Sequence, residues 1–136
     1  MAVPTLYQST DAGAPALTGE VGSLITVLDA ILVDGYGAKS GAGWTKPYSG
    51  TNLAVYETSR GRVLHVEDNG SRAGAAFARI RGADTTSSAA VADLVDPHPS
   101  DGSYTWVKTG AASAVARPWK ALATANAIML FTTTQD

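Results

Sequence analysis

Cysteine is absent from all 136 residues of the chain. Disulfide bonds, thiolate metal sites and cysteine nucleophiles are therefore excluded, and a domain of this length needs neither a disulfide nor a metal to hold its core. Charge is also scarce, because Asp, Glu, Lys and Arg make up 16% of the residues, against roughly a quarter in an average globular protein. The surface must therefore be built largely from Ser, Thr, Gly, Ala and Asn, a composition that suits close packing of repeated copies.

The chain has no run of basic residues, and its formal net charge is −2. Its densest basic cluster is formed by Arg72, Arg79 and Arg81. Three cations are too few for the several phosphate contacts that non-specific nucleic-acid binding requires. We interpret this cluster as the solvated face of a strand, and we expect no nucleic-acid partner.

Long apolar runs are missing as well. The longest, residues 24–33, is interrupted by polar side chains and falls far short of the roughly 20 residues that a membrane-spanning helix needs. The opening residues MAVPTLYQST have neither the basic start nor the apolar centre of a signal peptide. We therefore expect no secretory leader and no membrane partner.

The length predicts a single domain with a short leading segment. Residues 1–17 are expected to form an extended arm, because Pro4 and Pro15 disfavour a helix and no periodic pattern is present. Residues 18–136 are expected to form one β-rich domain. The arm carries three apolar side chains that we expect to contact another chain: Val3, Leu6 and Tyr7.

One amphipathic helix is predicted over residues 20–33, because apolar residues recur there at steps of three and four. Thr18 or Ser23 can cap its start, Glu20 suits the positive end of the helix dipole, and Gly35 is placed to end it. Residues 34–43 are rich in glycine and are expected to form turns. The apolar stripe consists of Val21, Leu24, Ile25, Leu28, Ile31 and Leu32.

After residue 43 the apolar pattern changes to a period of two, which indicates strands. Asn69-Gly70 and Thr124-Ala125-Asn126 are typical of hairpin turns. We expect an α+β, mostly β fold: an antiparallel sheet or β-sandwich of about seven strands, with one amphipathic helix near the N-terminus packed on it. The first predicted strand begins at Trp44. The others span residues 53–58, 63–67, 75–81, 104–108, 117–123 and 128–132.

Two regions of this β-rich part carry further expectations. Residues 84–102 are predicted to be a loop with a short helical turn at 89–94. In the strand 75–81, Phe77 and Ile80 are expected to point inward.

The glycine-rich segment from Gly35 to Gly41 invites comparison with a phosphate-binding loop. A Walker loop needs glycine immediately before its lysine, and here Ala38 precedes Lys39. Such a loop also precedes a helix, whereas this segment follows one. We interpret it as the end of the helix and a linker.

No pattern of residues indicates a catalytic or metal site. His65 and His98 are the only histidines and do not share a zinc-ligand spacing. Glu67-Asp68 lacks the twelve-residue loop of a calcium site, and no G-x-S-x-G is present. Paired carboxylates for glycoside cleavage stay open, because their pairing is spatial. We predict no cofactor, no metal and no enzymatic activity.

Aromatic residues offer the one constellation that favours binding, because such side chains on a β-surface can stack on sugars or anchor an interface. Trp44 and Trp119 are expected in the core. For Trp106 a buried and an exposed position both stay open, and Tyr104, Trp106 and Lys108 are expected on one face. The candidate interface residues are therefore Val3, Leu6, Tyr7, Tyr104 and Trp106.

Several short motifs, in order along most of the chain, resemble a family of uncharacterised virion proteins of tailed bacteriophages. The resemblance implies a structural part of a virion and does not say which part. It is carried by Asp11-Ala-Gly-Ala-Pro15, Gly22-Ser-Leu-Ile25, Leu28-Asp29-Ala30, Gly35-Tyr-Gly37, Gly43-Trp-Thr-Lys-Pro47, Gly50-Thr-Asn52 and Ala116-Arg-Pro-Trp119.

With this resemblance, the sequence predicts a non-enzymatic virion protein, made in the host cytoplasm, of the head decoration or cement type. Its expected partners are the major capsid or tail proteins and copies of itself, and the arm is expected to lie across a neighbouring subunit. Deletion of residues 1–16 is then expected to abolish incorporation and leave the domain folded. The alternative is a tail, baseplate or fibre component in which Tyr104 and Trp106 stack on a host glycan.

Overall fold

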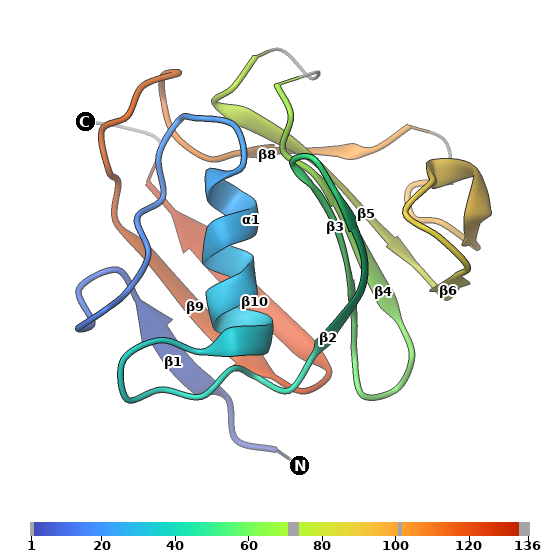
Figure 1. The fold of residues 1–136 in the computed structure, drawn as a ribbon, viewed down its shortest axis with the longest axis horizontal. Helices are drawn as coiled ribbons and strands as arrows, with labels where there is room; N and C mark the ends of the chain where they lie inside the picture. Colours follow the sequence, from blue (N-terminus) through green and yellow to red (C-terminus); the bar gives the residue numbers. More distant parts are fainter. Residues whose placement is uncertain (1, 71–73, 101, 134–136) are drawn as a thin grey trace.

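A computed structural model describes residues 2–70, 74–100 and 102–133 of the chain. It confirms a mostly β α+β fold, with antiparallel strands and one helix near the N-terminus (Figure 1). The elements are β1 (Thr5–Gln8), α1 (Ser23–Leu28), a π-helical turn (Asp29–Asp34), β2 (Thr45–Gly50), β3 (Leu53–Glu57), β4 (Val63–Glu67), β5 (Phe77–Ala83), β6 (Thr85–Thr86), a 3₁₀ turn (Val91–Asp93), β7 (Leu94–Val95), β8 (Tyr104–Val107), β9 (Trp119–Thr124) and β10 (Ala127–Thr132).

Within the described residues the strands form three antiparallel sheets, in the orders β1-β9-β10, β2-β3-β4-β5-β8 and β6-β7. Figure 1 shows α1 in front of the two larger sheets, with β1 and β9 on one side and β3 to β5 on the other. The core lies between the helix and both sheets. It is formed by side chains such as Leu28 and Ile31 from the helix, Tyr56 and Val66 from the larger sheet, and Trp119 from the smaller one.

The helix begins later than residue 20 because Gly22, with a φ of 82°, lies just before it in a left-handed conformation. Neither Thr18 nor Ser23 caps it. Instead, the N–H of Leu24 donates to Oδ2 of Asp68 at 2.9 Å, a residue that follows β4. The helix then widens into the π-helical turn and ends before Gly35, whose φ of 74° requires glycine.

The prediction that residues 1–17 form a separate arm is wrong, because residues 5–8 pair with β9 as an edge strand of the smaller sheet. Tyr7 is 1% exposed, and its hydroxyl donates to the carbonyl O of Ser40 at 2.7 Å. Leu17, at the end of the predicted arm, is fully buried and bridges to Arg117. Removing residues 1–16 would therefore remove part of the core, so this deletion cannot leave the domain intact. The partner strand lies more than a hundred residues away, which is why no local pattern revealed it.

Within the predicted loop at 84–102, residues 84–100 contain regular structure, because β6 and β7 pair and a 3₁₀ turn precedes β7. This segment covers the side of the larger sheet that faces away from the helix. There, Leu94 packs with Val55, Val63 and Ala83 in a second, smaller cluster.

The expectation for β5 is half right. Ile80 packs against the main core beside the buried Ala78, whereas Phe77 lies at the alternate position on the other face of the sheet. Trp44 and Trp119 are buried as predicted. The hairpin between β9 and β10 has a two-residue turn, Ala125-Asn126. The hairpin signal at residues 68–71 lies partly outside the described residues.

Candidate interaction surface

The outer face of the β1-β9-β10 sheet is apolar. Along β9, Trp119, Ala121 and Ala123 point into the core, and the residues between them point outward. A sheet covered on one side normally presents polar side chains on the other, but here four large apolar side chains are exposed. We call them the outer patch: Leu6 (44% exposed), Leu122 (37%), Met129 (57%) and Phe131 (55%).

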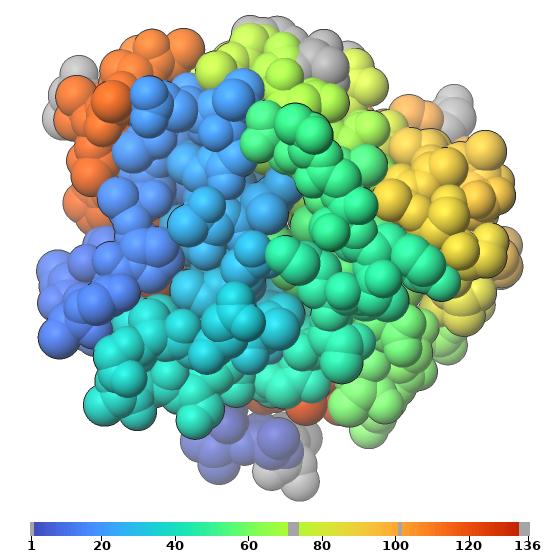
Figure 2. All heavy atoms as spheres, in the orientation of Figure 1, coloured from blue at the N-terminus to red at the C-terminus, as the bar shows by residue number. Residues whose placement is uncertain are grey.

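Strand register places the outer patch in one continuous area. Leu6, Leu122 and Met129 lie directly opposite one another across the three strands. In the next outward row, Phe131 lies opposite Lys120, which lies opposite Gln8. Cross-strand neighbours are about 5 Å apart, so these side chains form a single surface. Figure 2 shows the opposite side of the molecule, where the helix and the segments around it cover the sheet and β10 is almost hidden.

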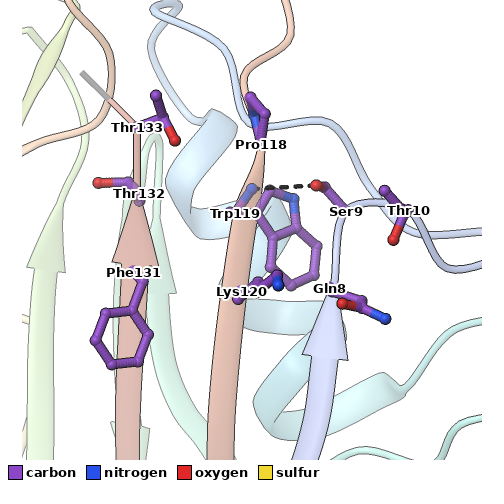
Figure 3. A pocket seen from close by; sticks show the side chains of 9 residues that line it. All are labelled: Gln8, Ser9, Thr10, Pro118, Trp119, Lys120, Phe131, Thr132 and Thr133. Carbon is purple, nitrogen blue, oxygen red and sulfur yellow. Dashed lines mark hydrogen bonds between the residues drawn. The ribbon is translucent and has the colours of Figure 1, made fainter. Parts of the chain in front are cut away.

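One end of the outer patch borders a shallow hollow of about 210 Å³. Figure 3 shows the side chains that line it, with Phe131 at one side and the loop after β1 at the other. The backbone N–H of Trp119 donates to Oγ of Ser9 at 3.1 Å across this hollow. Lys120 is its one charged side chain, so the hollow is suited to receive an apolar or hydroxyl-bearing group.

A second hollow, of about 200 Å³, lies between β8 and β10, where the two larger sheets meet. We call it the seam slot. The indole of Trp106 lines it, and the buried Nε1–H of this indole has no acceptor among the residues that the structure describes. Such an unpaired donor costs about 1–3 kcal/mol. All the lining residues are apolar: Leu24, Leu28, Leu64, Ile80, Trp106, Ile128 and Leu130.

The backbone directions along β10 follow from those of β9, because groups on an antiparallel strand alternate between its two neighbours. The carbonyl O of Trp119 accepts a hydrogen bond from the N–H of Ser9 at 2.9 Å, so Trp119 and every second residue after it face β1. The intervening residues of β9 bond to β10, where Met129 is one partner. The N–H and C=O groups of Ile128 and Leu130 therefore point to the free edge.

At the other edge of this sheet, β1, side chains bond to most of the outward backbone groups. Nζ of Lys39 donates to the carbonyl O of Leu6 at 2.6 Å. The N–H of Gln8 donates to Oδ2 of Asp11 at 3.0 Å and to the hydroxyl O of Tyr36 at 3.1 Å. These contacts leave little for a further strand to bond to, so the β1 edge is closed.

Asp11 is the centre of this cluster. Its Oδ2 accepts hydrogen bonds from Nζ of Lys39 and from the hydroxyl of Tyr36, both at 2.7 Å. The hydrogen bond from Lys39, then that from Tyr36, lowers the pKa of Asp11 to about 2. Burial, with the Asp11 carboxylate nearby, raises the pKa of Tyr36, which therefore keeps its proton.

Two buried polar clusters elsewhere hold segments of the chain together. Lys108 and Asp68, both fully buried, form an ion pair at 2.6 Å, and Nζ of Lys108 also donates to the carbonyl O of Glu20. Burial raises the pKa of Asp68, while the hydrogen bond from Lys108 acts in the opposite direction. Lys108 shares a face with Tyr104 and Trp106, as the sequence predicted, but at Lys108 this face is buried inside the domain.

The second cluster joins β4 and β5 to the segment that covers them. Nε2 of His65 donates to the carbonyl O of Ala89 at 2.9 Å, and Nε of Arg81 donates to the carbonyl O of Gly102 at 2.7 Å. Arg81 also pairs with Glu67 at 3.0 Å. Burial lowers the pKa of His65, which favours the neutral ring. Both ring nitrogens of His65 therefore contact other groups of the same chain.

The structure separates the five residues predicted to form an interface. Leu6 belongs to the outer patch, and Val3 is 88% exposed just before β1. Tyr7 is buried and cannot contact another chain in this fold. Tyr104 is 60% exposed on β8, but Trp106 is partly buried against the core in the seam slot. The two aromatic residues on β8 therefore do not form the expected pair of exposed stacking surfaces.

Sequence reasoning missed Leu122, Met129 and Phe131. A signal was present in residues 127–132, AIMLFT, where apolar residues occupy consecutive positions instead of alternate ones. A strand covered on one face only should read apolar and polar in turn. The unbroken run therefore indicated that its outward face is apolar too.

Comparison of the chain with models of protein families, with curated proteins and with solved structures finds no match. Among the described residues, no three His, Asp or Glu side chains lie close enough to hold a metal ion. None of the helices in this part of the chain has the length and apolar character needed to cross a bilayer.

Proposed function

We propose that the protein is a non-enzymatic structural component of a tailed-phage virion, of the head decoration type, and that it attaches to the major capsid subunits through the outer patch. The observation that carries this proposal is the row of exposed apolar side chains across β1, β9 and β10. A contiguous group of exposed apolar side chains on a single chain commonly marks an interaction site. The sequence resemblance to virion proteins supports the choice of partner.

The chemistry of the outer patch suits a shell that is covered by many copies. Its four members are apolar, and Lys120 is the charged residue in the rows that they occupy. Attachment through such a face depends on removing apolar surface from water, which contributes about 25 cal/mol per Å². It therefore depends little on salt, unlike attachment through surface ion pairs.

Particle incorporation of a double variant, Leu6→Ser with Leu122→Ser, tests this proposal. Both residues lie away from the β10 edge. Losing two partly buried contacts of about 1 kcal/mol or more each should lower occupancy on particles at least about tenfold. A matched control is Val95→Ser with Val115→Ser, two residues that are 51% and 56% exposed elsewhere on the chain. Occupancy is measured from the protein content of purified particles, and normal occupancy of the Leu6 and Leu122 variant would reject the outer patch as the attachment site.

A second candidate, a tail or fibre component that binds a host glycan, is favoured by one observation. Tyr104 is 60% exposed at the edge strand β8 and could stack on a sugar ring. The position of Trp106 against the core leaves Tyr104 without the second platform that the sequence suggested. A glycan-binding or cell-adsorption assay with Tyr104→Ala distinguishes the two functions, because a head decoration protein should show no change.

A further inference from the structure

We infer that the free edge of β10 is a self-association site, at which β10 of a second copy of this chain pairs antiparallel across a two-fold axis. This inference concerns the isolated protein and does not depend on the proposed role in a virion. It rests on three features of the same strand: its outward backbone groups, its uncharged apolar sequence and the seam slot beside it.

Backbone groups are the first feature. The described part of the β1-β9-β10 sheet ends at β10, while the N–H and C=O groups of Ile128 and Leu130 point outward. An edge strand of this kind is a template for another strand, and proteins usually protect it with a charge, a proline or a bulge. In the larger sheet, edge strand β2 carries Lys46, Pro47 and an irregular register. Strand β10 has no such device.

The sequence of β10 makes a second copy a suitable partner. Residues 127–132 carry no charge that would repel an identical strand. A two-fold axis at Met129 brings Ile128 opposite Leu130 of the other copy, and it forms about four backbone hydrogen bonds. In this register both faces of the new strand pair are apolar. Ile128 and Leu130 pair on the inner face, and Met129 lies opposite Met129 of the other copy on the outer face. The two outer patches then join into one surface.

The seam slot supplies the third feature. In the proposed register, the inward side chains at positions 128 and 130 of the incoming strand lie over the slot between β10 and β8. Its volume of about 200 Å³ is enough for one large apolar side chain, since a cavity of about 150 Å³ holds benzene. One hydrogen bond joins the two strands across the slot, from Oγ1 of Thr132 to the carbonyl O of Val107 at 3.2 Å. The register pairs residues 127–131 of the two copies, so Thr132 lies beyond the paired stretch.

The absence of cysteine from the chain allows a direct test. In Met129→Cys, the new thiol would meet its symmetry mate at a non-hydrogen-bonded pair, where Cα atoms are about 4.5 Å apart and a disulfide can form. Leu122→Cys is the matched control on the outer patch. Its two copies would lie about 14 Å apart, three strand spacings, beyond the reach of a disulfide. We expect mild oxidation to convert the Met129 variant into a covalent dimer at least about tenfold faster than the Leu122 variant; equal rates would overturn the inference.

Amide exchange of the unmodified protein provides a second test that needs no variant. The N–H groups of Ile128 and Leu130 should exchange about tenfold more slowly in concentrated than in dilute samples, because pairing protects them. The N–H of Met129 bonds to β9 and should not change. Exchange at Ile128 and Leu130 that is equally fast at both concentrations would overturn the inference. A dimer that fails to join particles would instead reject the proposed function alone.

Discussion

The two edge strands of the β1-β9-β10 sheet differ in what their outward backbone groups meet. At β1, the side chains of Asp11, Tyr36 and Lys39 bond to the outward groups of Leu6 and Gln8. At β10, apolar side chains surround the outward backbone groups, and no strand of the described sheet forms hydrogen bonds with these groups. A small domain can thus protect one edge with a polar cluster, part of which comes from a distant loop, and leave the opposite edge open to a partner.

The largest expected effect is a difference in the free energy of unfolding between two variants, each of which removes an aromatic side chain from one of the edge strands. Tyr7→Ala on β1 should lower the free energy of unfolding by about 3–5 kcal/mol, because it leaves a cavity in the core. Phe131→Ala on β10 should change it by less than about 0.5 kcal/mol, because the ring is 55% exposed. Urea unfolding of the two variants measures this difference. Similar losses for both would mean that the outer patch is covered within the single chain.

An intermediate effect concerns association at the β10 edge. Met129→Lys places two like charges opposite each other in the proposed dimer, so it should weaken dimerisation about tenfold or more. Met129→Leu keeps an apolar side chain and serves as the control. Analytical ultracentrifugation measures both, and thermal unfolding should find the two monomers equally stable, because residue 129 is largely exposed. Unchanged dimerisation of the lysine variant would exclude a two-fold axis at this residue.

The smallest effect concerns pH. The pKa of Asp11 is lowered from 3.8 to about 2, so the carboxylate stabilises the folded protein above pH 4, and this contribution is lost as the pH falls through about 2. The Gln8 amide, which donates to Asp11, should therefore exchange in excess of its intrinsic rate, that is with lower protection, as the pH falls from 4 to 2. Ile128 on the β10 edge has no titratable neighbour on its strand and should follow the ordinary dependence. Asp11→Asn should remove the excess at Gln8, and a persisting excess would contradict the assignment.

Local patterns were sufficient to predict much of the fold. The stripe from Val21 to Leu32 predicted the helix, and period-two alternation predicted most long strands within a few residues. The start of the helix was not predictable, because its cap comes from Asp68, 44 positions away. Strand β1 was missed for the same reason: four residues carry little periodicity, and their partner is near the other end of the chain.

The candidate site could be predicted only in part. Leu6 was identified, but for the wrong reason, as part of a free arm rather than as an outward residue of a sheet. Tyr7, its neighbour, faces the opposite way, because successive side chains of a strand alternate between faces. Whether the even-numbered or the odd-numbered side chains of β1 point outward depends on how this strand pairs with β9. That pairing depends on tertiary structure and cannot be read from the local sequence. The consecutive apolar residues of β10 were the readable signal.

The pairing of β1 with β9 also sets the order in which the chain can mature. Thr5–Gln8 are synthesised more than a hundred residues before their hydrogen-bonding partner at Trp119–Thr124. Contacts so far apart in sequence are slow to form. Until they do, the rings of Tyr7 and Trp119 have not been brought together on the core side of the sheet. The smaller sheet can therefore assemble only after β9 has been synthesised, so the core side chains of β1 stay uncovered on that side until then.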